Sequence, residues 1–390
     1  FMPANLGCRS PDPNLPIAPL LKKRSAGFSH ALINAFGFGG NNGSVVVGHS
    51  LENTPTESAP AASATLKMNV IANACRTGAG DLQATHVALE HGRTCAGCLA
   101  DDQIDQSLTP RQLRRLKRLP RIVSGLAADI LLDASPLPAP DSLIFSTAWG
   151  ALTETYDFLT HLFAHDECYP SPTDFVGSVH NAPAGQVAMR HHITGANITL
   201  TGGERSFEQA FQAACLQGAH GDRNVLLISA DEYHPDFSAL LDAPTSASFQ
   251  PADGGAAFYL SPVKADPASA SIELLYYGQP LREKDLTAPR IQFEVERAQA
   301  ALCQSGKPLK VAAVLHGGSE HLRVLNEAQL GTFQHQTGIG GPYIDYRLWL
   351  GNFPTVSAAA VSIALGFLQA GRLPEAMCPD GAVAIDNRAI

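Results

Sequence analysis

The chain has 390 residues, of which 45% are hydrophobic and 16% charged, and its formal net charge is −9 at pH 7. This composition predicts a globular protein with a large core in one or two domains, and the acidic balance argues against general binding of nucleic acid. No stretch reaches the roughly 18 apolar residues of a membrane span, the first residues do not form a secretory signal, and the eight cysteines are scattered. We therefore expect a cytoplasmic protein with reduced thiols.

The first 48 residues predict a strand, a glycine-rich turn and a second strand. Residues 9–19 are rich in proline and indicate an extended loop. The run from Ser29 to Gly43 then leads into three consecutive valines at 45–47, which favours a pair of strands around the turn. Residues 49–64 are rich in Ser, Pro, Thr and Ala, a composition typical of a flexible linker.

The chain from residue 66 alternates strand and helix patterns up to about residue 191. Asp81 stands where an N-cap is expected, and Pro120 is expected to interrupt a long helical region. The predicted elements are a strand at 68–72, helices at 81–91 and 111–133, a strand at 143–145, and helices at 152–163 and 181–191.

The stretch from Ile198 to Gly218 predicts a strand, a sharp turn and a helix. Ile198–Leu200 is short and apolar, Gly202 and Gly203 permit a tight turn, and apolar residues then recur at helical spacing. In acyl-transfer enzymes such a turn often presents the nucleophile beside a helix N-terminus. Here the turn offers Gly203 and Glu204, so the stretch by itself favours an ordinary connection between strand and helix.

The rest of the chain repeats the alternation, and several of its elements are apolar on all sides. The predicted strands are 225–228, 254–260, 272–277 and 310–315, and the predicted helices are 292–303 and 355–368. Two halves with similar element order and covered sheets predict a layered α/β fold. The lone CxxC at Cys95–Cys98 has no second ligand pair nearby, so we expect no metal site there.

Three motifs carry a resemblance to a known family. They are the run Asn34–Asn42, which reads Asn-Ala-Phe-Gly-Phe-Gly-Gly-Asn-Asn, the run Leu315–Ser319, which reads Leu-His-Gly-Gly-Ser, and the segment Tyr346–Asn352. With them, the chain resembles the β-ketoacyl-acyl carrier protein synthases, the ketosynthases of the thiolase-like superfamily. The resemblance implies five layers in the order α-β-α-β-α and two similar halves.

The family motifs stand in an unusual order along this chain. Residues 1–48 resemble the C-terminal segment of a ketosynthase, and residues 49–65 form the linker. Residues 66–262 and 263–390 then resemble the N-terminal and C-terminal halves of a second ketosynthase. Either residues 1–48 are the tail of an active ketosynthase fused upstream, or the chain is one circularly permuted domain.

The resemblance also implies which chemistry the chain has and which it has changed. In the family a Cys accepts an acyl group from a carrier protein, and two His assist decarboxylation and stabilise the oxyanion. Here Gly203 stands at the Cys position, Asn352 at the second His position and Arg347 at the lysine position, while His316 is retained. Such substitutions resemble the chain-length factors, which are inactive alone and pair with an active ketosynthase.

The function that this implies is a non-catalytic subunit of fatty acid, polyketide or aryl-polyene synthesis. We expect the partners to be an active ketosynthase and an acyl carrier protein, without a cofactor. The run from His180 to Gly185 also resembles the short chain-length factors found near aryl-polyene synthases. The alternative is a malonyl-carrier decarboxylase or an acyltransferase that works without Cys.

Several residues receive roles on this basis. His316 is either a retained acid–base residue or a structural remnant, and Arg347, Glu204 and Phe38 are expected near the substrate, with Glu204 also able to cap a helix or form a buried pair. Phe38 is expected to reach Gly203 and His316 because the segment 33–47 is predicted to dock into the sheet of the larger body. One basic cluster is either a solvated helix face or a docking patch for an acidic carrier protein. It comprises Arg111, Arg114, Arg115, Lys117, Arg118 and Arg121.

Overall fold

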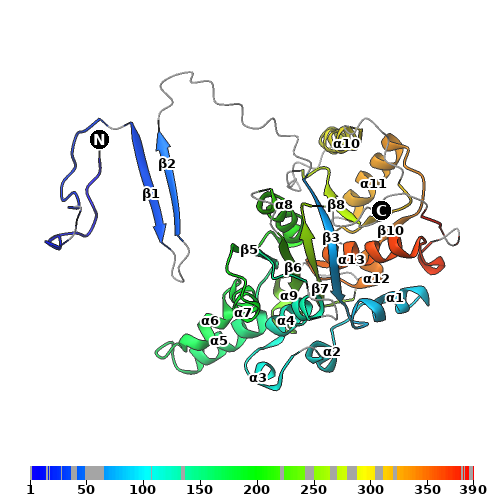
Figure 1. The fold of residues 1–390 in the computed structure, drawn as a ribbon, viewed down its shortest axis with the longest axis horizontal. Coiled ribbons are helices and arrows are strands. Elements are labelled where there is room, and N and C mark those ends of the chain that lie inside the picture. Colours follow the sequence, from blue (N-terminus) through cyan, green and yellow to red (C-terminus); the bar gives the residue numbers. More distant parts are fainter. Residues whose placement is uncertain are drawn as a thin grey trace. The chain divides into compact units, whose positions relative to one another are not determined.

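The computed structural model divides the chain into two compact units, Phe1–Ala64 and Thr65–Ile390 (Figure 1). The residues that it describes are 2–14, 16, 18–27, 29–36, 42–48, 66–106, 108–132, 137–219, 224–241, 250–263, 270–278, 288–303, 311–318, 323–378, 381, 383–385 and 390.

The first unit contains the predicted pair of strands. β1 (His30–Phe36) and β2 (Asn42–Gly48) are antiparallel and form a sheet of their own. Both strands expose apolar side chains to solvent: Leu32 of β1 is 62% exposed and Val46 of β2 is 64% exposed. Phe38 lies outside the described residues, so its place near the substrate and the docking of this pair stay predictions.

The second unit is built on a mixed sheet of six strands in the order β5-β4-β6-β7-β3-β8. β4 is parallel to β5 and to β6, whereas the pairs β6–β7, β7–β3 and β3–β8 are antiparallel. The strands are β3 (Leu66–Arg76), β4 (Ser142–Ser146), β5 (Asn197–Leu200), β6 (Val225–Asp231), β7 (Gly254–Ser261) and β8 (Ser271–Leu274).

Helices cover both faces of this sheet, which explains why its central strands are apolar on both sides. Along β6, Val225 and Leu227 belong to one hydrophobic cluster, and Leu226 and Ile228 belong to the other. The first face packs against α1 (Leu82–Glu90), α8 (Ser206–Gly218) and α13 (Val356–Ala370). The second face packs against α4 (Arg118–Leu131) and α7 (Ala182–His191).

A second, smaller sheet follows in the C-terminal half. β9 (Val314–His316) and β10 (Tyr343–Asp345) are parallel, and residues next to them join the cluster of α8 and α13. α10 (Ala288–Cys303) and α11 (Arg323–Thr337) pack on each other in the same half (Figure 1). The expected α/β fold is therefore confirmed, although the second sheet has two strands in the described residues where the first has six.

The remaining helices are short, apart from α5. They are α2 (Asp101–Asp105), α3 (Pro110–Leu113), α5 (Leu152–Ala164), α6 (Pro172–Ser178), α9 (Ser238–Leu241) and α12 (Tyr346–Leu350), with 3₁₀ turns η1 (Gly203–Arg205) and η4 (Glu375–Met377). Within the described residues, no helix is both long and apolar enough to cross a membrane.

One expected helix boundary is wrong and another is confirmed. Pro120 does not interrupt α4, because it lies in the first turn of that helix, where its missing N–H would have had no acceptor within the helix. The break comes earlier, between the end of α3 at Leu113 and the start of α4 at Arg118. Asp81 caps α1 as predicted, and its carboxylate accepts a hydrogen bond from the Ala84 N–H at 2.8 Å.

Candidate functional site

The turn between β5 and α8 has the backbone geometry of a nucleophile elbow. Gly203 has φ +61°, in the left-handed region that L-residues rarely adopt, and a Cβ built on it would meet no described atom within 4 Å. Nucleophile elbows hold one exposed residue on a strained turn between a strand and a helix. The turn therefore has space for a side chain at position 203, but the residue there is a glycine.

Ser206 holds this turn in place from the first residue of α8. Its hydroxyl accepts the Gly202 N–H at 2.9 Å and lies 2.7 Å from the Gly203 carbonyl oxygen, to which it donates. A Cβ on Gly202 would lie 2.1 Å from Gln209 Oε1, so a side chain there would displace the Gln209 amide. The two glycines thus serve different needs, and only the second one faces open space.

Arg347 and Asn352 meet beside the turn, where Glu204 also lies. Arg347 Nη1 donates to Asn352 Oδ1 at 2.5 Å, and its Nη2 lies 3.6 Å from Glu204 Oε1. The Arg347 side chain is only 3% exposed, whereas the Glu204 side chain is 44% exposed. The buried guanidinium of Arg347 is therefore paired with a carboxylate that is open to solvent. Arg347 Nε is buried and has no hydrogen-bond partner in the described structure.

Short elements fix the positions of Arg347 and Asn352. Asp345 caps α12 by accepting the Arg347 N–H at 3.0 Å. The helix ends at Gly351, whose φ of +87° turns the chain so that the Asn352 N–H donates to the Gln250 carbonyl at 2.9 Å. The local sequence therefore holds the side chains at the predicted lysine and second-histidine positions in direct contact.

His316 lies at the end of β9, paired in register with Asp345 of β10. Burial lowers the pKa of His316, although the Asp345 carboxylate acts in the opposite direction, so the imidazole is neutral at pH 7. It opens into a cavity of about 310 Å³ that Gly317, Val295, Leu330 and Phe333 also line. His316 forms no hydrogen bond with Arg347 or Asn352 in the described structure, so it stands apart from that pair.

Tyr346 links the two parts of the site. A Cβ on Gly317 would lie 2.3 Å from the Tyr346 ring, so the glycine after His316 leaves room for this phenol. Burial raises the pKa of Tyr346, and the charges of Arg347 and Glu204 both act on it. The neutral phenol therefore lies beside Gly317, the residue after His316, and directly precedes Arg347 in the chain.

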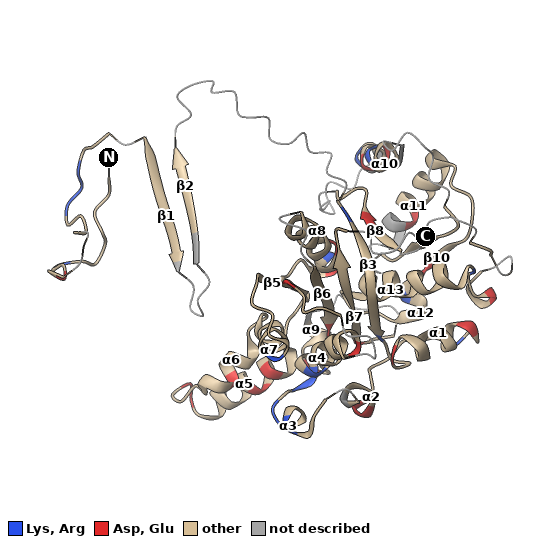
Figure 2. Cartoon of the chain, in the orientation of Figure 1, with Lys and Arg blue, Asp and Glu red and all other residues tan. Residues whose placement is uncertain are grey.

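The predicted basic cluster does not behave as one patch. Arg118 is braced internally, with Nε 2.5 Å from Asp253 Oδ2 and Nη2 donating to the Leu99 carbonyl at 2.7 Å. Lys117 forms an ion pair with Asp157 of α5. Arg114 and Arg115 are exposed in the turn after α3, and Figure 2 shows blue on the segment between α3 and α4. A docking role stays a prediction, and the exposed arginines are the residues available for it.

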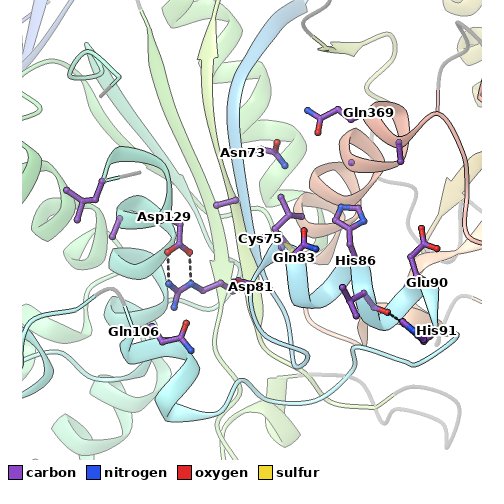
Figure 3. Close-up of a pocket in the computed structure, with 18 residues that line it drawn as sticks. Asn73, Cys75, Asp81, Gln83, His86, Glu90, His91, Gln106, Asp129 and Gln369 are labelled. Carbon is purple, nitrogen blue, oxygen red and sulfur yellow. Dashed lines mark hydrogen bonds and ion pairs between the residues drawn. The ribbon is translucent and has the colours of Figure 1, made fainter. Parts of the chain in front are cut away.

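A larger cavity that no sequence motif predicted lies on another part of the unit, between β3, α1, α4 and α13 (Figure 3). It measures about 1090 Å³. On one wall Arg76 forms two bonds of 2.8 Å to the Asp129 carboxylate. On the other wall, the His86 ring lies very close to Gly366. A Cβ on this glycine would be only 2.1 Å from the ring. Gly366 in α13 was the sequence signal for the close contact with His86.

Comparison with known proteins agrees with the fold of the larger unit. Residues 99–274 match the family model of the beta-ketoacyl synthase N-terminal domain. No match was found among curated proteins. Because all three of the solved structures described next are less than 25% identical to the chain, they bear on its fold alone.

Three solved structures resemble the chain over most of its length. The ishigamide ketosynthase/chain length factor is 18% identical with a TM-score of 0.61, over 82% of this chain and 97% of that chain. A beta-ketoacyl synthase from Burkholderia phymatum STM815 is 13% identical with a TM-score of 0.64, over 82% and 94%. The AntDE:AntF complex, a type II polyketide synthase carrier protein with its ketosynthase, is 15% identical with a TM-score of 0.59, over 82% and 97%.

The predicted resemblance is thus confirmed by two independent comparisons. The chain has the thiolase-like fold of the ketosynthases and chain length factors, and its residues 99–274 match the family model of the beta-ketoacyl synthase N-terminal domain.

Proposed function

We propose that the chain is a subunit of the chain-length-factor type, which pairs with an active β-ketoacyl synthase and does not itself carry the acyl nucleophile. The observation that carries this proposal is the elbow turn, where Gly203 occupies the tip at φ +61° and faces open space. A thioester requires a thiolate at that tip, and glycine has no side chain to supply one.

The second feature in support is the chemistry of the residues beside the turn. Condensation in this family needs proton transfer and oxyanion stabilisation by two histidines. Here Arg347 and Asn352 bind one another at the two other changed positions, and Arg347 is a permanent cation that cannot exchange a proton near neutral pH. These two side chains can shape and polarise a pocket, but they do not form an acid–base pair.

The described thiols near the core do not offer a substitute nucleophile. Burial raises the pKa of Cys95 to about 11 and that of Cys215 to about 12. These groups are protonated at pH 7, and the thiol is a poor nucleophile in that form.

The surface that we assign to the ketosynthase partner is the β5 edge with the neighbouring helices. β5 is the edge strand of the six-stranded sheet, and Ile198 on it is 39% exposed. Helices α5, α6 and α7 continue this side, with Phe163 61% exposed, Phe175 54% exposed and Val176 64% exposed (Figure 1). An open strand edge beside exposed aromatic and aliphatic side chains is typical of a protein–protein interface.

The test is a condensation assay with malonyl-carrier and acyl-carrier protein, for the chain alone and with an active ketosynthase added. We expect no condensation product from the chain alone, and a change in product length when it is added to the ketosynthase. The alternative function is a malonyl-carrier decarboxylase or an acyltransferase without Cys. Acetyl-carrier formation from malonyl-carrier by the chain alone would support that alternative and contradict the proposal.

Gly203→Cys is the variant that tests the elbow directly. The open space at Gly203 accommodates a thiol, and the left-handed backbone costs the new side chain about 1–2 kcal/mol, so the variant should fold. We expect no condensation activity, because Asn352 still stands at the second-histidine position and the transition state lacks its donor. Condensation by this single variant would show that the rest of the site is competent.

A further inference from the structure

The pocket between α3, α4 and α7 gathers positive charge without any acid. It measures about 780 Å³, its polar wall includes Arg111, Arg115 and Arg190, and its described lining contains no Asp or Glu. This is unusual for a chain with 36 acidic and 27 basic residues. An enclosure with one sign of charge raises the local concentration of the opposite ion.

The three guanidinium groups are not neutralised by their neighbours. In the described part of the chain, none of the three forms an ion pair, whereas the adjacent Lys117 and Arg118 are paired with Asp157 and Asp253. Neighbouring basic residues in this region therefore form ion pairs, whereas Arg111, Arg115 and Arg190 do not in the described part of the chain.

Two buried polar atoms on α7 point to a missing ligand. Arg190 Nη1 and Gln186 Oε1 are buried, lie one helical turn apart, and have no hydrogen-bond partner in the described structure. A buried donor without an acceptor is costly, and a buried cation more so. The charge of Arg190 also reaches His191, whose pKa is lowered first by burial and then by this neighbour.

We propose that this pocket binds an organic phosphate that carries at least two negative charges. Guanidinium groups match phosphate oxygens with paired hydrogen bonds, and three of them suit more than one charge. The volume lies within the range of small-molecule sites, about 300–1,000 Å³. Leu116 and Met189 supply an apolar wall for the organic part. A small ligand of this kind binds the chain alone, so the inference stands apart from the proposed pairing.

The experiment is calorimetric titration of the full chain with ADP, inorganic pyrophosphate and adenosine. We expect ADP and pyrophosphate to bind, ADP more tightly through its organic part, and adenosine not to bind. The affinity for both phosphates should fall as ionic strength rises, because salt screens the arginines. The pKa of His191, followed by NMR, should rise when ADP binds, since the anion offsets the charge of Arg190.

Two variants and a matched control locate the site. Arg115→Gln and Arg190→Gln should each weaken ADP binding about tenfold or more, the loss expected for one charge-assisted contact. Arg114→Gln is the control, because Arg114 lies on the same turn, does not line the pocket, and should change the affinity less than about threefold. If Arg190→Gln fails to fold, Arg111→Gln replaces it.

Three results would overturn the proposal. The first is the absence of ADP and pyrophosphate binding at low salt. The second is an equal loss of affinity in the Arg114 control. The third is binding of a polyglutamate peptide while neither phosphate binds, which would identify the pocket as part of a surface for an acidic protein.

Discussion

Two buried arginines in this chain, Arg76 and Arg347, have the same exposure and opposite degrees of pairing. Each side chain is 3% exposed. Arg76 donates twice to the Asp129 carboxylate at 2.8 Å and once each to the carbonyls of Gln103 and Ile104, at 2.7 and 2.9 Å. Arg347 has one short bond to Asn352, a carboxylate at 3.6 Å and an unpartnered Nε.

We propose that this difference separates a structural arginine, Arg76, from a functional one, Arg347. Space for Arg76 is built into α4, since a Cβ on Gly125 would lie 2.8 Å from its guanidinium carbon. The pair that Arg76 forms with Asp129 joins β3 to α4, and the Arg76 guanidinium also donates hydrogen bonds to two carbonyls. Arg347, beside the elbow turn, still has one donor, its Nε, without a hydrogen-bond partner in the described structure. Buried groups with incomplete pairing concentrate at functional sites, since a ligand or substrate can complete them.

The largest expected effect is the loss of the Arg76 brace. Arg76→Gln removes the buried cation that pairs with Asp129 and donates to the Gln103 and Ile104 carbonyls, so we expect a loss of about 3–5 kcal/mol in the free energy of unfolding. Chemical denaturation measures it. Arg372→Gln is the control, because the Arg372–Glu90 pair is on the surface and should cost less than about 1 kcal/mol. Equal losses in the two variants would contradict the structural role of Arg76.

A smaller effect is expected at Arg347, and it sharpens the contrast. Arg347→Gln loses one strong hydrogen bond and a partly exposed carboxylate partner, which predicts a loss of about 1–3 kcal/mol. The same denaturation experiment should therefore rank Arg347→Gln clearly below Arg76→Gln. If Arg347→Gln destabilises the chain as much as Arg76→Gln does, then Arg347 is a structural residue and the contrast fails.

Glu154 extends the comparison to a buried acid. Burial, followed by the nearby charge of Glu232, raises the pKa of Glu154 to about 7, and its Oε2 has no partner in the described structure. Burial also raises the pKa of Glu232 to about 7. A carboxyl whose pKa is raised in the folded state binds more protons there than in the unfolded state. The free energy of unfolding should therefore fall as pH rises from about 4.5 to about 7.

Glu154→Gln tests this dependence, because glutamine copies the neutral form of the acid. We expect the variant to have a higher Tm than the original chain at pH 8, and a smaller difference at pH 5. Thermal unfolding at several pH values gives the answer. An unchanged pH dependence of Tm would mean that Glu154 does not titrate differently in the folded state.

Local patterns in the sequence predicted the main elements and the tight turn between β5 and α8. The β-branched run before Gly202, the pair of glycines and the apolar spacing after Ser206 were enough to place β5, the turn and α8. Asp81 was recognised as an N-cap because an N-cap is set by adjacent residues. The resemblance then brought Arg347 and Asn352 to the same site as Gly203, and the structure places them beside Glu204.

Contacts between distant residues were beyond the reach of those patterns. The Arg76–Asp129 brace joins residues 53 positions apart, and nothing local distinguishes these two side chains from solvated ones. Arg118 was grouped with its basic neighbours, although its partner Asp253 lies 135 positions away. Only the packing of α4 against the sheet decides which arginines turn inward and which remain on the surface.

The central claim is that this chain accepts no acyl group, and intact-protein mass spectrometry tests it most directly. The chain is incubated with acyl-carrier protein, alone and together with an active ketosynthase. The intact masses of this chain and of the ketosynthase are then measured. We predict an acyl adduct on the ketosynthase and an unchanged mass for this chain in both mixtures. A stoichiometric acyl adduct on this chain would contradict the account, and peptide mapping would show which residue replaces the missing thiol at Gly203.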